Sequence, residues 1–130
     1  MIILDTDVLI EIFDRDSDRG EGALEAIIGS GEDIATTSIN LHEILYGLEK
    51  YAKPVKDVLL LPVLLYDKRD AQTSAMIELR SEADGGAARR TDAMIAAIAI
   101  NRGALLFTFN VRHFKGLEEM GLKMFPATED

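Results

Sequence analysis

Residues 1–13 read Met-Ile-Ile-Leu-Asp-Thr-Asp-Val-Leu-Ile-Glu-Ile-Phe, an apolar run that meets two acids and then turns into a helical pattern. The apolar run Ile2 to Leu4 is typical of a short buried strand, and Asp7 to Phe13 fits a helix that follows it directly. A strand joined to a helix in this way is the first unit of an alternating α/β chain.

The same alternation continues to the end of the sequence. Further strands are expected at 34–37, 63–66, 105–107 and 123–125. Helices are expected over 21–28, from Ser38 as N-cap to about Lys50, briefly from Pro54, over 71–82, and over 91–102 with Gly103 as the terminating residue. This order predicts a parallel, doubly wound sheet flanked by helices, in which ligands bind beyond the carboxyl ends of the strands. No linker interrupts the pattern, so we expect a single domain over residues 1–130.

Composition narrows the class of protein. The formal net charge is −9, from 14 Lys and Arg against 23 Asp and Glu, which argues against a passive nucleic-acid clamp. The absence of cysteine excludes thiolate metal sites and cysteine nucleophiles, and two histidines are too few for a three-histidine zinc site. The longest apolar run, Ala93 to Ile100, is far too short to span a membrane, and no basic leader precedes Asp5. We therefore expect a cytoplasmic protein without a membrane partner.

Asp5 and Asp7 stand directly after the first predicted strand. Alternate residues of an extended segment point the same way, so both carboxylates are expected to converge. Two like charges that converge favour a hard divalent cation such as Mg²⁺ or Mn²⁺ between them. The alternative is structural, with Asp5 or Thr6 capping the following helix.

Two further acids occupy less obvious positions. Asp92 opens an apolar helix and is flanked by Arg89 and Arg90, although an acid in a first helical turn is favoured by the helix dipole alone. Glu43 lies away from the apolar face of its helix, so periodicity predicts a solvated residue.

Polar residues also follow the strand at 105–107. Thr108 and Asn110 stand at its carboxyl end, where a ligand site is expected, although Asn is also an ordinary loop residue. His113 follows this segment next to Arg112 and is otherwise a surface histidine.

Four segments together resemble the PIN-domain ribonucleases, and in particular the VapC-type toxins of prokaryotic toxin–antitoxin pairs. The resemblance covers nearly the whole chain in the family's order. The segments are Leu4-Asp-Thr-Asp-Val-Leu-Ile10, Thr37-Ser-Ile-Asn-Leu-His-Glu-Ile-Leu-Tyr-Gly47, Thr91-Asp-Ala-Met-Ile-Ala-Ala97 and Thr108-Phe-Asn-Val-Arg-His-Phe114. It implies a PIN-like α/β/α sandwich whose central sheet has short, mostly parallel strands.

The resemblance also implies site residues. Asp5, Glu43 and Asp92 would form the acidic metal site, with Thr6 and Thr108 at neighbouring polar positions; for Glu43 this overrules the periodicity. Two departures stand out, because Asn110 falls where the family often carries a fourth Asp, and Asp7 falls where it frequently has Asn. The first removes a charge and the second adds one, so the number of metal ions is left open.

The activity implied is Mg²⁺- or Mn²⁺-dependent hydrolysis of an RNA phosphodiester to a 5′-phosphate and a 3′-hydroxyl. The bound ion would activate water and polarise a phosphoryl oxygen, with Asn110 as a fourth residue of the catalytic set. Arg89, Arg90 and Arg112 would contact the RNA backbone. The resemblance further implies a homodimer, inhibited by a small antitoxin that lies over an apolar groove.

Three other functions are open at this point. A phosphatase resembling the haloacid dehalogenases would use Asp5 and Asp7, but the later strand ending in Phe107 supplies no acidic pair. A non-catalytic PIN-like module would bind RNA or protein without cleaving it. An acidic α/β interaction domain would use its carboxylates only as helix caps.

Overall fold

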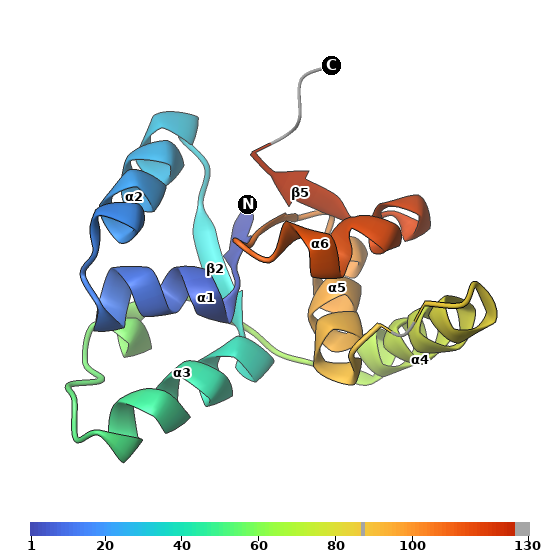
Figure 1. The fold of residues 1–130 in the computed structure, drawn as a ribbon, viewed down its shortest axis with the longest axis horizontal. Helices are drawn as coiled ribbons and strands as arrows, with labels where there is room; N and C mark the ends of the chain where they lie inside the picture. The colour runs from blue at the N-terminus through green and yellow to red at the C-terminus, as the bar shows by residue number, and fades with distance from the viewer. Residues whose placement is uncertain (87, 127–130) are drawn as a thin grey trace.

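The computed structural model describes residues 1–86 and 88–126, which form a five-stranded sheet with helices on both faces (Figure 1). The strands are β1 (Ile2–Leu4), β2 (Ile34–Thr37), β3 (Val63–Leu64), β4 (Leu105–Phe107) and β5 (Lys123–Phe125). They run in the order β3-β2-β1-β4-β5, and every pairing is parallel. The predicted sheet is confirmed, and within the described residues it is wholly rather than mostly parallel.

The helices are α1 (Thr6–Leu9), α2 (Asp18–Ser30), α3 (Ser38–Lys50), α4 (Lys68–Ala83), α5 (Arg90–Arg102) and α6 (Val111–Phe114). Three tighter or wider turns complete the set: the π-helical η1 (Ile10–Asp14) and the 3₁₀ segments η2 (Val58–Leu60) and η3 (Lys115–Met120). Gly103 ends α5 with φ 62°, a left-handed conformation that glycine adopts without steric cost, as predicted.

Four local predictions need correction. The helix expected over Asp7 to Phe13 changes to π-helical geometry at Ile10, and Pro54 opens no helix, since the next helical turn starts only at Val58. Ser38 is the first helical residue rather than the N-cap, because the hydroxyl of Thr37 accepts the capping hydrogen bond from the Asn40 N–H. The third strand ends at Leu64, two residues earlier than expected.

Two apolar clusters fill the space on the two faces of the sheet. Ile3 and Leu106 point into a cluster formed with α4, α5, α6 and η3, whereas Ile2, Leu4 and Phe107 point into one formed with α1, α2, α3 and η2. Successive side chains of a strand alternate between faces, so three-residue strands serve both cores. None of the helices in the described ranges is long and apolar enough to cross a membrane.

The strand order reverses direction next to β1. From β1 the chain moves to β2 and β3 on one side, then crosses to β4 and β5 on the other. The crevice beyond the carboxyl ends of β1 and β4 is therefore the switch point, the usual place for a ligand in an open α/β sheet. The residues that follow these two strands, Asp5 and Thr108, both lie there.

Candidate active site

Asp5 is the buried carboxylate at the centre of the switch point. It is the last extended residue after β1 and the N-cap of α1, with 7% of its surface exposed. One oxygen, Oδ1, accepts hydrogen bonds from the Thr6 N–H (2.9 Å) and the Asn40 Nδ2 (2.8 Å). The other, Oδ2, accepts one from the Thr108 hydroxyl (2.7 Å). Capping and site formation are therefore not alternatives for Asp5, because the same carboxylate does both.

Asp7 reaches the same place by a different route from the one predicted. It belongs to the first turn of α1, so strand alternation does not bring it beside Asp5. Its Oδ2 instead accepts from the Phe109 N–H (3.0 Å) and lies 3.4 Å from the Thr108 hydroxyl, which joins the two acids. Burial, and then the negative charge of Asp5, raise the pKa of Asp7 above its ordinary value.

The loop after β4 supplies hydroxyl and backbone groups to these acids. Thr108 is buried, and its hydroxyl accepts from the Asn110 N–H (3.0 Å) while it donates to Asp5. The Asn110 side chain is exposed and makes no capping hydrogen bond to α6. The predicted fourth residue thus contributes its backbone to the site, with its side chain beside it.

Glu43 comes to the acids from α3. Its side chain is exposed, in agreement with the periodicity, yet its Oε1 accepts a hydrogen bond from the Thr6 hydroxyl at 2.7 Å. The contact links α3 to α1 across 37 residues of sequence.

Asp92 comes from the first turn of α5 and is 9% exposed. Burial raises its pKa above the ordinary value. The charge of Arg89 opposes the increase, the charge of Asp5 adds to it, and His113 and Glu43 make smaller contributions of opposite sign. The charges of Asp5, at the N-cap of α1, and of Glu43, in α3, therefore both act on Asp92 in α5.

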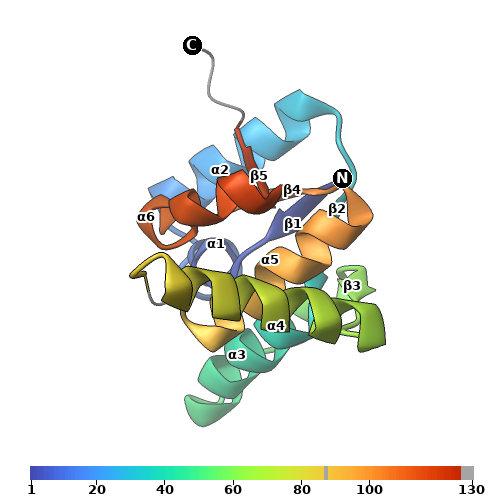
Figure 2. The ribbon, with the colours of Figure 1, turned by 90° about the vertical axis from the view of Figure 1, so that its right-hand side faces the viewer.

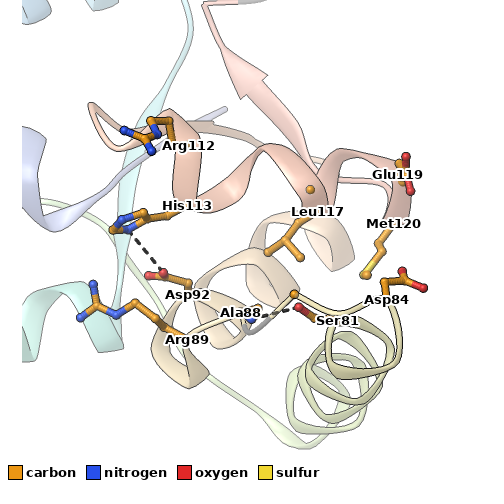
Figure 3. Close-up of a pocket in the computed structure, with 12 residues that line it drawn as sticks. Ser81, Asp84, Ala88, Arg89, Asp92, Arg112, His113, Leu117, Glu119 and Met120 are labelled. Carbon is orange, nitrogen blue, oxygen red and sulfur yellow. Dashed lines mark hydrogen bonds and ion pairs between the residues drawn. The ribbon is translucent and has the colours of Figure 1, made fainter.

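A pocket of about 580 Å³ opens beside Asp92 (Figure 3). His113 Nδ1 lies 3.9 Å from Asp92 Oδ2 across its mouth, and Arg89 and Arg112 line the same end. Leu117 and Met120 provide an apolar wall farther in.

Arg90 is placed elsewhere. Its guanidinium donates two hydrogen bonds of 3.1 Å to the Glu78 carboxylate on α4, and Arg90 is not among the residues that line this pocket. Of the three arginines predicted to face RNA, the structure brings Arg89 and Arg112 to the acids and pairs Arg90 with α4.

The donor chemistry fits a hard divalent cation. All the acids offer carboxylate oxygens, Asp5 Oδ2 accepts a hydrogen bond from the Thr108 hydroxyl, and burial, with a smaller contribution from the charge of Asp5, raises the pKa of Asp7 and Asp92. Within the described residues, no three acidic or histidine side chains are gathered closely enough to enclose an ion. Mg²⁺ does not need such a cage, because it keeps several waters and binds through one or two carboxylates together with substrate phosphate.

Sequence reasoning missed Asn40, which is completely buried and joins Asp5 to Thr6. Its signal was present, because Asn40 lies four residues before Ile44 and eight before Leu48, on the buried face of α3. A polar residue on such a face has to find hydrogen-bond partners, and here it finds them in the site.

Known proteins share the sequence pattern and the fold of this chain. The family model of the PIN domain matches residues 2–119. The VapBC2 complex of Rickettsia felis bound to a promoter DNA fragment contains a chain 26% identical, with a TM-score of 0.79 over 95% of this chain and 97% of that one. DNA-bound VapBC of Salmonella typhimurium is also 26% identical, with a TM-score of 0.73 over 95% of both chains. No curated protein gives a significant match.

A more distant structure shares the fold alone. VapC20 of Mycobacterium tuberculosis, described as a toxin that cleaves the sarcin–ricin loop, is 14% identical, with a TM-score of 0.69 over 89% of this chain and 95% of that one. The fold and the arrangement of its elements are thus shared over almost the full length of all three structures.

Proposed function

The chain belongs to the PIN-domain family, and from this premise we propose that it is a Mg²⁺- or Mn²⁺-dependent endoribonuclease acting as the toxin of a VapBC-type toxin–antitoxin pair. The observation that carries the proposal is the link of Asp5 to Glu43 through Thr6, together with a buried Asp92 on which the charges of both acids act. Helix capping alone does not require acids at the N-cap of α1, in α3 and in α5 to influence one another, whereas a hydrated Mg²⁺ would be stabilised by all three.

Each acid has a distinct part in the proposed reaction. Asp5 is held by three donors and would offer Oδ2, and Asp92 would offer its carboxylate beside His113. Glu43, being exposed, would act through water. Such an ion supplies the Lewis acidity that polarises the phosphoryl group and activates water for in-line attack. Asp7 adds a negative charge beside Asp5. Asn110, in contrast, adds no charge at the position where the family often has an Asp.

The pocket mouth provides the contacts for RNA. Arg89 and Arg112 flank Asp92, and their guanidinium groups are suited to phosphate oxygens on either side of the scissile bond. His113, 3.9 Å from Asp92, would hold the same acid in place or donate to phosphate. Arg90 is left out of this set because Glu78 already binds it.

The proposal includes partners and setting. The VapBC structures above are complexes, one crystallised with a promoter DNA fragment, so a small antitoxin is the partner we propose. We further propose one PIN domain over residues 1–130, a homodimer, and action in the cytoplasm. The match to the PIN family removes the support for a haloacid dehalogenase-like phosphatase, because its nucleophile motif was the only feature in favour.

Expression in a bacterial host tests the proposal. Induction of the wild type is expected to arrest growth and to produce a mapped RNA cut with a 5′-phosphate, and Asp5→Ala is expected to do neither. If both proteins accumulate in soluble form and neither arrests growth nor cuts RNA, the chain is instead a non-catalytic PIN-like module.

A further inference from the structure

Asn40 is an amide with no exposed surface whose polar groups are all engaged at the candidate site. We propose that Asn40 is a positioning residue, which fixes the orientation of Asp5 directly and that of Glu43 through Thr6. The predicted effect on metal binding rests on the proposed function. The orientation of Asp5 and Glu43 rests only on the hydrogen bonds.

The direction of the amide is determined by its neighbours. The Thr37 hydroxyl lies 2.7 Å from Asn40 Oδ1 and donates to it, while the same hydroxyl accepts the capping hydrogen bond from the Asn40 N–H. The Nδ2 group therefore faces Asp5, where it donates to Oδ1 at 2.8 Å. A rotated amide would place two oxygens against each other and would lose both contacts.

The second hydrogen of the Asn40 amide connects it to Glu43 through the Thr6 hydroxyl. Nδ2 also donates to the Thr6 hydroxyl oxygen at 3.0 Å. Because a hydroxyl has one proton, and Thr6 accepts from Asn40, its own proton is directed to Glu43 Oε1 at 2.7 Å. An exposed carboxylate that would otherwise sample many rotamers is thereby tied to a buried group.

A purely structural role does not explain the choice of residue. Asn40 shares the buried face of α3 with Ile44 and Leu48, where an apolar side chain would add to the core without requiring hydrogen bonds. Thr36 provides a contrast, since it is equally buried but donates only to the Leu4 carbonyl (2.8 Å) and reaches no acid. Thr36→Val is therefore a matched control for the loss of a buried hydrogen bond.

The test compares Mn²⁺ affinity, measured by calorimetry on purified wild type, Asn40→Leu and Thr36→Val. Asn40→Leu is expected to weaken Mn²⁺ binding by about tenfold or more, the usual effect of removing a group that orients metal ligands, and Thr36→Val by less than about twofold. Equal Mn²⁺ affinity in Asn40→Leu and Thr36→Val would overturn the proposal.

A second pair of variants, at Thr6, tests the proposal if Asn40→Leu does not fold. Thr6 is only half-buried, so Thr6→Val removes the relay hydroxyl with little change in shape, and Thr6→Ser keeps it. Thr6→Val is expected to bind Mn²⁺ about tenfold more weakly than Thr6→Ser. No difference between the two would contradict the relay to Glu43.

A metal-free measurement separates this proposal from the proposed function. In ¹⁵N spectra of the wild type, the side-chain NH₂ protons of Asn40 are expected to exchange with water much more slowly than those of the exposed Asn110. Slow exchange in a protein that binds no Mn²⁺ and cuts no RNA would leave the geometry intact and refute the nuclease. Exchange as fast as that of Asn110 would refute the positioning role itself.

Discussion

A buried acid lies at each end of α5, and the surroundings shift the pKa values of the two acids in opposite directions. At the first turn, burial raises the pKa of Asp92, and the negative charges of Asp5 and Glu43 add to the increase. At the last turn, Asn101 and Arg102 donate hydrogen bonds to Asp70 of α4, a helix that lies across α5 (Figure 2).

Asp70 is fully compensated. Its oxygens accept from Arg102 Nη1 (3.0 and 3.1 Å), from Asn101 Nδ2 (2.9 Å) and from the Asp67 N–H (3.0 Å). Burial acts to raise its pKa, but the Arg102 hydrogen bonds and the other donors outweigh it and hold the pKa below the ordinary value of 3.8. An acid that serves stability is given its counter-charge within the chain.

Asp92 is only partly compensated. The charge of Arg89 acts to lower its pKa and His113 lies 3.9 Å away, but burial, with the charges of Asp5 and Glu43, outweighs them. A bound cation would supply further positive charge at this end of α5, and the predictions below test that difference between the two acids.

The largest expected effect is on catalysis. Asp92→Asn should lower the rate of single-turnover RNA cleavage at fixed Mn²⁺ on the order of 100-fold or more, because it removes a metal-facing charge. Asp70→Asn, compared per folded molecule, should cleave at nearly the wild-type rate. Similar losses of cleavage rate in the two variants would contradict the different roles assigned to Asp92 and Asp70.

The next effect is on stability. Asp70→Asn should lower the free energy of unfolding by about 3 kcal/mol, because the half-buried Arg102 loses its buried counter-charge and keeps only the exposed Asp67 carboxylate, 3.7 Å away. Urea denaturation without metal measures this quantity, and Asp92→Asn should lose no stability in the same experiment. A loss below about 1 kcal/mol for Asp70→Asn would show that solvent already screens the Arg102 pair.

The two acids should also differ in their pH dependence. Ionised Asp92 destabilises the fold above its raised pKa, so Asp92→Asn should be more stable than wild type at neutral pH, and the difference should vanish as the pH falls to 3.8. Asp70 contributes stability above 3.8, so the deficit of Asp70→Asn should persist at 3.8 and shrink only below it. Parallel curves for the two variants would contradict the opposite pKa shifts.

The smallest effect concerns the arginines. Arg112→Ala should weaken RNA binding and reduce the salt dependence of affinity by about one unit of slope, as expected for one lost phosphate contact. Arg90→Ala should leave the slope unchanged, because Arg90 binds Glu78. Equal slopes for the two variants in filter-binding titrations would show that Arg112 does not face RNA.

Much of the fold was predictable, because short apolar strands and Gly-terminated helices are local patterns. The order of the acids along the chain, compared with a known family, also predicted an acidic metal site. That site and the catalytic roles of its acids stay predictions, whereas the link of Asp5 to Glu43 through Thr6 is an observation.

The rest depended on contacts between distant segments. Periodicity places Glu43 at the surface, which is right, but its contact with Thr6 requires α1 to lie beside α3. Asp7 joins Asp5 through Thr108, which is 101 residues away. The Asp70–Arg102 pair spans 32 residues, so no local pattern announces it. Asn40 was detectable as a polar residue on an apolar face, but its partners were not.

The central claim is that Asp5, Glu43 and Asp92 use a divalent cation to cut RNA. The most direct measurement is cleavage of a defined RNA by the purified chain as Mn²⁺ is titrated, with wild type and Asp5→Asn compared at equal folded concentration. The account predicts that cleavage by the wild type rises saturably with Mn²⁺, is removed by chelation, and is absent in Asp5→Asn. Cleavage that persists after chelation, or that Asp5→Asn performs at the wild-type rate, would contradict it.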